Sequence, residues 1–212
     1  MTILLSFYLF KGNNILSLIA SLIGVTSLIF CAKGNPFGQL LMIVFSILYG
    51  IISFSYAYYG EMITYLGMTA PMALFSMITW IKNPYNDNRS EVKIKQLKLN
   101  ELLFMISVTA VVTFVFHFIL VYFHTANIIP STFSVATSFL AIYMTAKRTP
   151  FYAIAYAAND LVLIILWSLA SKTDITYISV VVYFSIFFLN DIYGFINWQK
   201  MHKQQIKSVM CQ

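Results

Sequence analysis

Seven apolar segments occupy most of this chain of 212 residues. A helix that crosses a bilayer needs about 20 mostly apolar residues, and each segment approaches or reaches that length. They cover residues 14–32, 37–57, 61–81, 100–123, 131–146, 150–170 and 176–198. Backbone groups have no water to bind inside lipid, so each segment must be a helix. We therefore expect an all-α integral membrane protein with seven transmembrane helices, forming a single membrane domain over residues 1–212.

The composition excludes several classes of protein. Hydrophobic residues make up 60% of the chain and charged residues 9%, which leaves no segment for a soluble domain. The net charge of +6 comes from residues scattered between apolar segments, so we expect no nucleic-acid partner. The G-x-x-x-x-G-K-[ST], G-x-S-x-G and H-E-x-x-H motifs do not occur, and the two cysteines lack metal spacing. We therefore expect no enzyme activity, no ATP hydrolysis, no metal site and no cofactor.

The basic residues predict how the chain lies in the membrane. If the N-terminus is outside, the inner connections hold eleven Lys and Arg side chains: Lys33, Lys82, Arg89, Lys93, Lys95, Lys98, Lys147, Arg148, Lys200, Lys203 and Lys207. Only Lys11 and Lys172 lie on the outer side. Because Lys and Arg accumulate in cytoplasmic loops, we expect the N-terminus outside and the C-terminus in the cytoplasm. The loop 82–99 and the tail 199–212 are then cytoplasmic, and the protein resides in the cell (inner) membrane.

A repeated hexapeptide divides the chain into two similar parts. AKGNPF begins at residue 32 and AKRTPF begins at residue 146, so the two copies are 114 residues apart. Each lies between the first and second helix of a group of three, and Trp80 and Trp198 close the two groups. The pattern predicts two parallel three-helix repeats, 14–81 and 131–198, joined by a linker helix over 100–123. Transporters are built this way, with sites near the midplane between the repeats.

Two Asn-Asp pairs lie within the apolar segments of the second repeat. Asn159 precedes Asp160, and Asn190 precedes Asp191. A charged group in the bilayer costs about 2.5–3.5 kcal/mol on insertion scales, so each needs a function or a partner. One interpretation is a water-accessible cavity where these groups bind a polar solute; the other is hydrogen bonding between helices. Neighbouring helical positions diverge by about 100°, so we expect one member of each pair to face the cavity and the other a neighbouring helix, and we favour the two Asn as ligands.

Aromatic residues accompany these polar groups. Tyr152, Tyr156 and Asn159 fall on one helical face, and Trp167 and Tyr193 lie on the same two helices as the Asn-Asp pairs. Aromatic rings beside an amide suit a flat heteroaromatic ligand that stacks and is held at its edge. Tyr and Trp near helix ends are alternatively interfacial anchors, and we expect that role for Trp80 and Trp198. The candidate binding residues are therefore Asn159, Asn190, Tyr156, Tyr193, Tyr152, Asp160, Asp191 and Trp167.

Pro71 lies inside the third apolar segment, in GMTAPMALF. Proline removes a backbone donor and crowds the preceding turn, so we expect a kink there. The corresponding segment of the other repeat has no proline.

The second repeat, from TSFLAIYMTAKRTPFYAIAYAANDLVLIILW to YFSIFFLNDIYGFINWQKM, resembles the PnuC-type vitamin transporters, whose best-known members take up nicotinamide riboside. The Y-G-x-x-x-W ending at Tyr193, Gly194 and Trp198 is the most specific part. The resemblance implies a SWEET-like 3+1+3 fold, oligomers in the membrane and a cytoplasmic kinase that traps the substrate. Nicotinamide riboside members carry W-x-x-W where this chain has Tyr152 and Ala155, and an Asn where it has Phe45; Asn159 matches.

We therefore expect a facilitator for nicotinamide riboside or a closely related vitamin or nucleoside, working by alternating access. Thiamine, riboflavin or a deoxynucleoside is the alternative within the same family. A seven-helix membrane receptor or assembly protein is the alternative of another class, although such a protein has no need of two parallel triplets.

Overall fold

The computed structural model describes residues 15–55, 59–86, 88–125, 127–173 and 175–210. Within these residues, seven helical spans are long and apolar enough to cross a membrane, which confirms the all-α membrane fold. Six consist of one helix each: α2 (Ile15–Ala32), α3 (Phe37–Ser55), α6 (Leu99–Tyr122), α7 (Ile128–Ala146), α8 (Tyr152–Ala170) and α9 (Ile178–Met210). The remaining span, Tyr59–Ile81, has three parts: α4 (Tyr59–Ile63), the π-helix η1 (Thr64–Thr69) and α5 (Ala70–Ile81). The short 3-10 helix η2 (Ile175–Tyr177) precedes α9.

The helices begin and end within a few residues of the expected positions, except at the C-terminus. There α9 continues beyond Trp198 to Met210, so the segment expected to be a tail is helical up to that residue. The extension buries Met201 and Gln205 on one face, and both side chains are less than a tenth exposed. Packing of this face, and not apolar length, accounts for the helix beyond Trp198.

The segment before Pro71 adopts the wider π geometry. The Ala70 N–H donates to the Tyr65 carbonyl, five residues earlier, and Pro71 follows in the first turn of α5. A proline ring crowds the carbonyl four residues before it, and a π turn widens the helix at such a point. The irregularity expected at Pro71 therefore takes the form of a π segment between Thr64 and Thr69.

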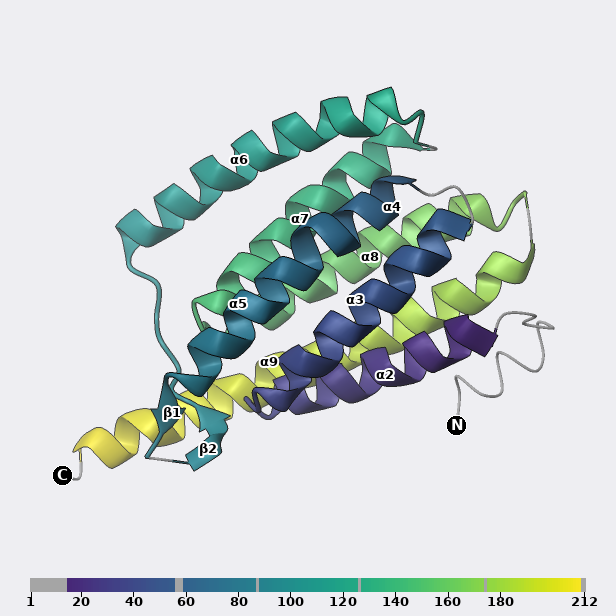
Figure 1. Ribbon diagram of the computed structural model, residues 1–212. Coiled ribbons are helices and arrows are strands. Elements are labelled where there is room, and N and C mark those ends of the chain that lie inside the picture. The colour runs from purple at the N-terminus through teal and green to yellow at the C-terminus, as the bar shows by residue number, and fades with distance from the viewer. Residues whose placement is uncertain (1–14, 56–58, 87, 126, 174, 211–212) are drawn as a thin grey trace.

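The two triplets of helices pack in the same order. In the first, α2 packs on α3, and α3 packs on α5; in the second, α7 packs on α8, and α8 on α9. Between the triplets, the first helix of each meets the third helix of the other, as α2 with α9 and α5 with α7. Figure 1 shows α6 apart from this bundle, along its edge beside α7. This exchange of partners is the packing expected of two parallel three-helix repeats joined by a linker.

A strap of residues 92–95 crosses one end of the bundle, following the hairpin of β1 (Pro84–Tyr85) and β2 (Asn88–Val92) (Figure 1). The Val92 N–H donates to the Gly34 carbonyl at 3.0 Å, and the Lys95 N–H donates to the Arg148 carbonyl at 3.0 Å. Gly34 and Arg148 are 114 residues apart, so they occupy equivalent places in the two repeats, and both have positive φ. The strap therefore joins corresponding loops of the two triplets.

Candidate functional site

Trp80 and Trp198 lie inside the protein, next to each other. Both side chains are fully buried, and their ring centroids are 5.4 Å apart. The expectation that they anchor the chain at the membrane interface is wrong. Trp198 lies within α9 and not at its end, because the helix continues for twelve more residues. The two rings fill the centre of the bundle at the end that the strap crosses, with Val92 and Ile94 of the strap in the same buried cluster.

A cavity of about 30 Å³ lies deeper in the bundle, between the two triplets. Eight of its lining residues form four pairs at the spacing of the repeat, 114 residues: Gly24 with Ser138, Leu28 with Ile142, Met42 with Tyr156, and Phe45 with Asn159. Equivalent positions of two repeats meet around the axis that relates them. The cavity therefore lies on that axis, where transporters with repeated helices have their sites.

The two repeats contribute differently to this cavity. In three of the four pairs the second repeat supplies the more polar residue: Ser138 for glycine, Tyr156 for methionine and Asn159 for phenylalanine. The first repeat supplies Thr69 from η1 and aromatic or aliphatic side chains. The second repeat therefore supplies most of the polar groups of the cavity, together with Phe184 and Phe187.

Asn159 is buried and held in place by two neighbours on α7. Its Oδ1 accepts hydrogen bonds from the hydroxyl groups of Thr137 and Ser138, each at 2.9 Å. An amide has one carbonyl oxygen and two N–H donors. Because the oxygen is occupied, Asn159 has mainly N–H groups to offer a ligand in the cavity.

Asp160 and Asp191 both line the cavity, from α8 and α9. Each is 4% exposed, and the two carboxyl groups lie within hydrogen-bonding reach of each other. An ionised carboxylate only accepts hydrogen bonds, so such a contact requires a proton on one of the two. The acids expected at bilayer depth are thus brought together at one point.

Comparison with known proteins identifies the family. Residues 14–200 match the family model described as nicotinamide mononucleotide transporter. The chain belongs to this family. It is 26% identical over 204 residues to the nicotinamide riboside transporter PnuC of Neisseria mucosa, covering 93% of this chain and 76% of that protein. A crystal structure of the vitamin B3 transporter PnuC has the same fold, with a TM-score of 0.81 at 23% identity, covering 97% of this chain and 90% of that one.

Membership of the PnuC-type family confirms three expectations from the sequence. The chain is a multi-pass membrane protein, it belongs to a family of transporters, and it is not an enzyme. Within the residues that the structure describes, no group of three or more His, Cys, Asp or Glu side chains is placed to hold a metal.

Four of the eight candidate residues of this PnuC-type chain line the cavity: Tyr156, Asn159, Asp160 and Asp191. The other four do not. Tyr152 is buried against Trp198, with ring centroids 4.8 Å apart, and Trp167 belongs to the largest hydrophobic cluster. Tyr193 is 49% exposed on the outer surface. Asn190 is partly exposed, and its Nδ2 has no hydrogen-bond partner among the described residues.

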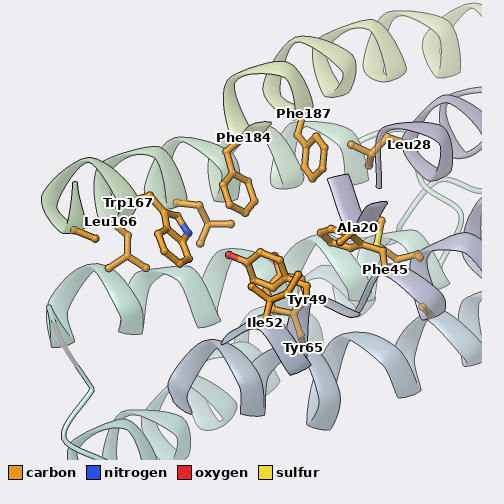
Figure 2. Close-up of a cluster of buried hydrophobic side chains, with 14 residues drawn as sticks. Ala20, Leu28, Phe45, Tyr49, Ile52, Tyr65, Leu166, Trp167, Phe184 and Phe187 are labelled. Atoms are coloured by element: carbon orange, nitrogen blue, oxygen red, sulfur yellow. The ribbon is translucent and has the colours of Figure 1, made fainter. Parts of the chain in front are cut away.

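Aromatic residues that the sequence analysis did not select form much of the wall. Phe45, Tyr65, Phe184 and Phe187 line the cavity, and Figure 2 shows them converging from helices of both triplets. The Phe45 ring lies 5.8 Å from that of Tyr65 and 5.8 Å from that of Phe187. Three of them are phenylalanines, which are frequent throughout the chain, so composition did not distinguish them.

Glu61, in α4, is another buried acid that the sequence analysis did not consider. It is 5% exposed, and its Oε2 has no hydrogen-bond partner in the described part of the chain. Glu61 is the first residue of the apolar segment 61–81, and a charged residue at such a position is typical of the end of a transmembrane helix. The available signal was its charge, which is as costly here as that of Asp160.

Proposed function

We propose that this chain is a facilitator for the uptake of nicotinamide riboside, or a closely related vitamin or nucleoside, across the cell membrane. It works by alternating access and without ATP hydrolysis. The relative named above as a nicotinamide riboside transporter supports this substrate class. The observation that carries the proposal is the cavity on the axis between the repeats, lined by equivalent positions of both.

The depth of the cavity supports a transport site. Asn159 is seven residues from the start of α8 and eleven from its end, and a helix rises about 1.5 Å per residue. The site is therefore about 10 Å from one end of the helix and about 16 Å from the other. A solute held there is near the middle of the bilayer, accessible in turn from either side.

The conformation is closed on both sides of the cavity. On the side of the strap, Trp80, Trp198 and Tyr152 fill the bundle. On the other side, Tyr49, Ile52, Trp167 and other members of the largest hydrophobic cluster do so (Figure 2). A cavity of about 30 Å³ has room for about one or two water molecules. A nucleoside enters only when the triplets rock apart, which opens one side and widens the cavity.

The lining supports specific contacts with a nicotinamide ring. Tyr156, Tyr65 and Phe45 offer ring faces for stacking. The N–H groups of Asn159 can donate to a carbonyl oxygen, such as that of a carboxamide. Thr69 and Ser138 also line the cavity, and their hydroxyl groups suit those of the ribose.

The orientation and the partners belong to the same proposal. The strap, the loops that contain Pro36 and Pro150, and the extension of α9 lie at one end of the bundle. The excess of Lys and Arg supports a cytoplasmic position for that end, with the N-terminus outside. The protein forms homo-oligomers in the membrane. A cytoplasmic kinase phosphorylates the substrate, so that it cannot return.

A competition assay in proteoliposomes tests this function. Uptake of radiolabelled nicotinamide riboside by the purified chain is measured with unlabelled nicotinamide riboside, thiamine, riboflavin or thymidine as competitors, and protein-free liposomes serve as the control. We expect saturable uptake, inhibited most strongly by nicotinamide riboside. Strongest inhibition by thiamine, riboflavin or thymidine would assign that substrate instead. Binding without uptake would contradict transport and favour a receptor.

A further inference from the structure

The Asp160–Asp191 pair has no counter-charge in the described part of the chain. No Lys, Arg or His lines the cavity among the described residues. Asp160 is 4% exposed, and its Oδ2 accepts no hydrogen bond from any donor group of the described chain. A buried carboxyl group without a donor needs a proton, a water molecule or a ligand that supplies positive charge.

The other titratable groups near the pair do not supply that charge. The elements packed around it present four such groups: Cys31 from α2, Tyr65 from η1, and Tyr152 and Tyr156 from α8. Glu61 of α4 lies near Tyr65 and adds another carboxyl group on that side. The residues of α3 and α7 that line the cavity are not titratable. Every one of these groups is neutral or negative, so the surroundings favour a positive ligand.

Asp160 and Asp191 both line the cavity in which a ligand would lie. Two carboxyl groups in contact cannot both be ionised at low cost, and a cation beside them stabilises the state in which one of them is charged. The aromatic rings of Phe45, Tyr65 and Tyr156 line the same cavity, and ring faces attract cations. Negative charge on the pair and the faces of the aromatic rings thus both favour a cationic ligand.

We propose that the Asp160–Asp191 pair selects a cationic ring over a neutral ring of the same shape. This inference rests on the proposed function and makes its substrate class more specific. The ring of nicotinamide riboside is an N-substituted pyridinium, which carries a positive charge. Its reduced dihydropyridine form is neutral and almost the same size. Riboflavin and thymidine are neutral as well, whereas the thiazolium of thiamine is charged.

The charged and reduced forms of the same riboside provide the test. Uptake of radiolabelled nicotinamide riboside into proteoliposomes is competed with unlabelled nicotinamide riboside or with its reduced form. The variants are Asp160→Asn and Asp191→Asn, with Asp191→Glu as the conservative change. The control is Glu91→Gln, because Glu91 lies outside the cavity, on β2. For the wild type we expect the reduced form to compete about tenfold or more weakly.

The quantity that decides the result is a ratio of inhibition constants, that of the reduced form divided by that of the charged form. In both Asn variants we expect it to fall toward one, through weaker binding of the charged form, while Asp191→Glu and Glu91→Gln keep the wild-type ratio. Equal competition in the wild type, or an unchanged ratio in the Asn variants, would overturn the inference. If the Asn variants do not give monodisperse protein, the wild-type and Asp191→Glu ratios decide it. Absence of uptake by the wild type would instead reject the proposed function.

Discussion

Trp80 and Trp198 each bind the repeat to which they do not belong. The Trp80 Nε1 donates to the Thr145 carbonyl at 2.9 Å, and the Trp198 Nε1 donates to the Cys31 carbonyl at 2.8 Å. The two acceptors are 114 residues apart, so they are equivalent positions at the ends of α2 and α7. Carbonyl groups in the last turn of a helix lack partners within the helix. The Gly34 N–H donates to the Cys31 carbonyl and the Arg148 N–H donates to the Thr145 carbonyl, so each tryptophan adds a second donor and the pair joins the triplets through two corresponding contacts.

Replacing either tryptophan by phenylalanine should destabilise the protein. Trp80→Phe and Trp198→Phe each remove one buried hydrogen bond, worth about 0.5–1.5 kcal/mol, and leave space beside the smaller ring. Melting temperatures of the purified variants in detergent measure the effect. Because the two rings touch, the double variant should lose less than the sum of the single losses. Tyr122→Phe is the control, since Tyr122 is 78% exposed on α6; an equal loss there would contradict the assignment.

The close approach of α2 and α3 depends on Gly38. A Cβ at this position would lie 2.6 Å from both the backbone N and the Sγ of Cys31 and 2.8 Å from the Ser27 carbonyl oxygen. Gly38→Ala should therefore force the helices apart, at a cost of roughly 1–3 kcal/mol. Gly67→Ala is the matched change, because a Cβ there meets only Ile63, at 3.9 Å. Equal melting temperatures for the two variants would show that this contact is not tight.

The strap depends on Gln205 of α9. Its Oε1 accepts from the Ile94 N–H at 2.9 Å, and its Nε2 donates to the Val92 carbonyl at 3.1 Å. Gln205→Ala leaves both backbone groups unpaired, and we expect a loss of about 1–3 kcal/mol together with faster hydrogen exchange at residues 92–95. Gln204→Ala, at the exposed neighbouring position, should exchange as the wild type does. Wild-type exchange in both variants would mean that other contacts hold the strap.

The ring of Tyr156 should matter more than its hydroxyl group. Tyr156 lines the cavity beside Asn159, and an aromatic face near a cation is worth about 0.5–2 kcal/mol. Tyr156→Ala should therefore weaken the affinity for nicotinamide riboside roughly 2- to 30-fold, whereas Tyr156→Phe should change it little. Competition uptake measures both variants, with Tyr122→Ala as the exposed control. An equal loss in the Phe and Ala variants would assign the contact to the hydroxyl group.

Apolar length and the repeated hexapeptide were sufficient to predict the spans and their order. Lipid allows one regular structure for such segments, so little else can form. The position of Trp198 was not predictable in the same way. A tryptophan at the end of an apolar segment resembles an anchor, and only the helix that continues to Met210 places it in the interior.

The rotation of each helix about its axis was harder to predict than its extent. Neighbouring residues diverge by about 100°, so we expected one member of each Asn-Asp pair to face the cavity. Asn159 and Asp160 both line it, whereas in the second pair only Asp191 does. Contacts between α8 and α9 set this rotation, and a single sequence does not contain them. Phe45 was noted only as a departure from the family. It lines the cavity at the position of the first repeat that corresponds to Asn159 in the second.

In the proposed function, the solute binds in the cavity on the axis between the repeats, with Asn159 as a ligand. The most direct measurement is the initial rate of nicotinamide riboside uptake over a range of concentrations for wild type, Asn159→Ala and Asn100→Ala in proteoliposomes. Asn100 is exposed in the first turn of α6 and serves as the matched control. We predict that Asn159→Ala loses about tenfold or more in apparent affinity while Asn100→Ala matches the wild type. Identical uptake curves for all three proteins would contradict the account.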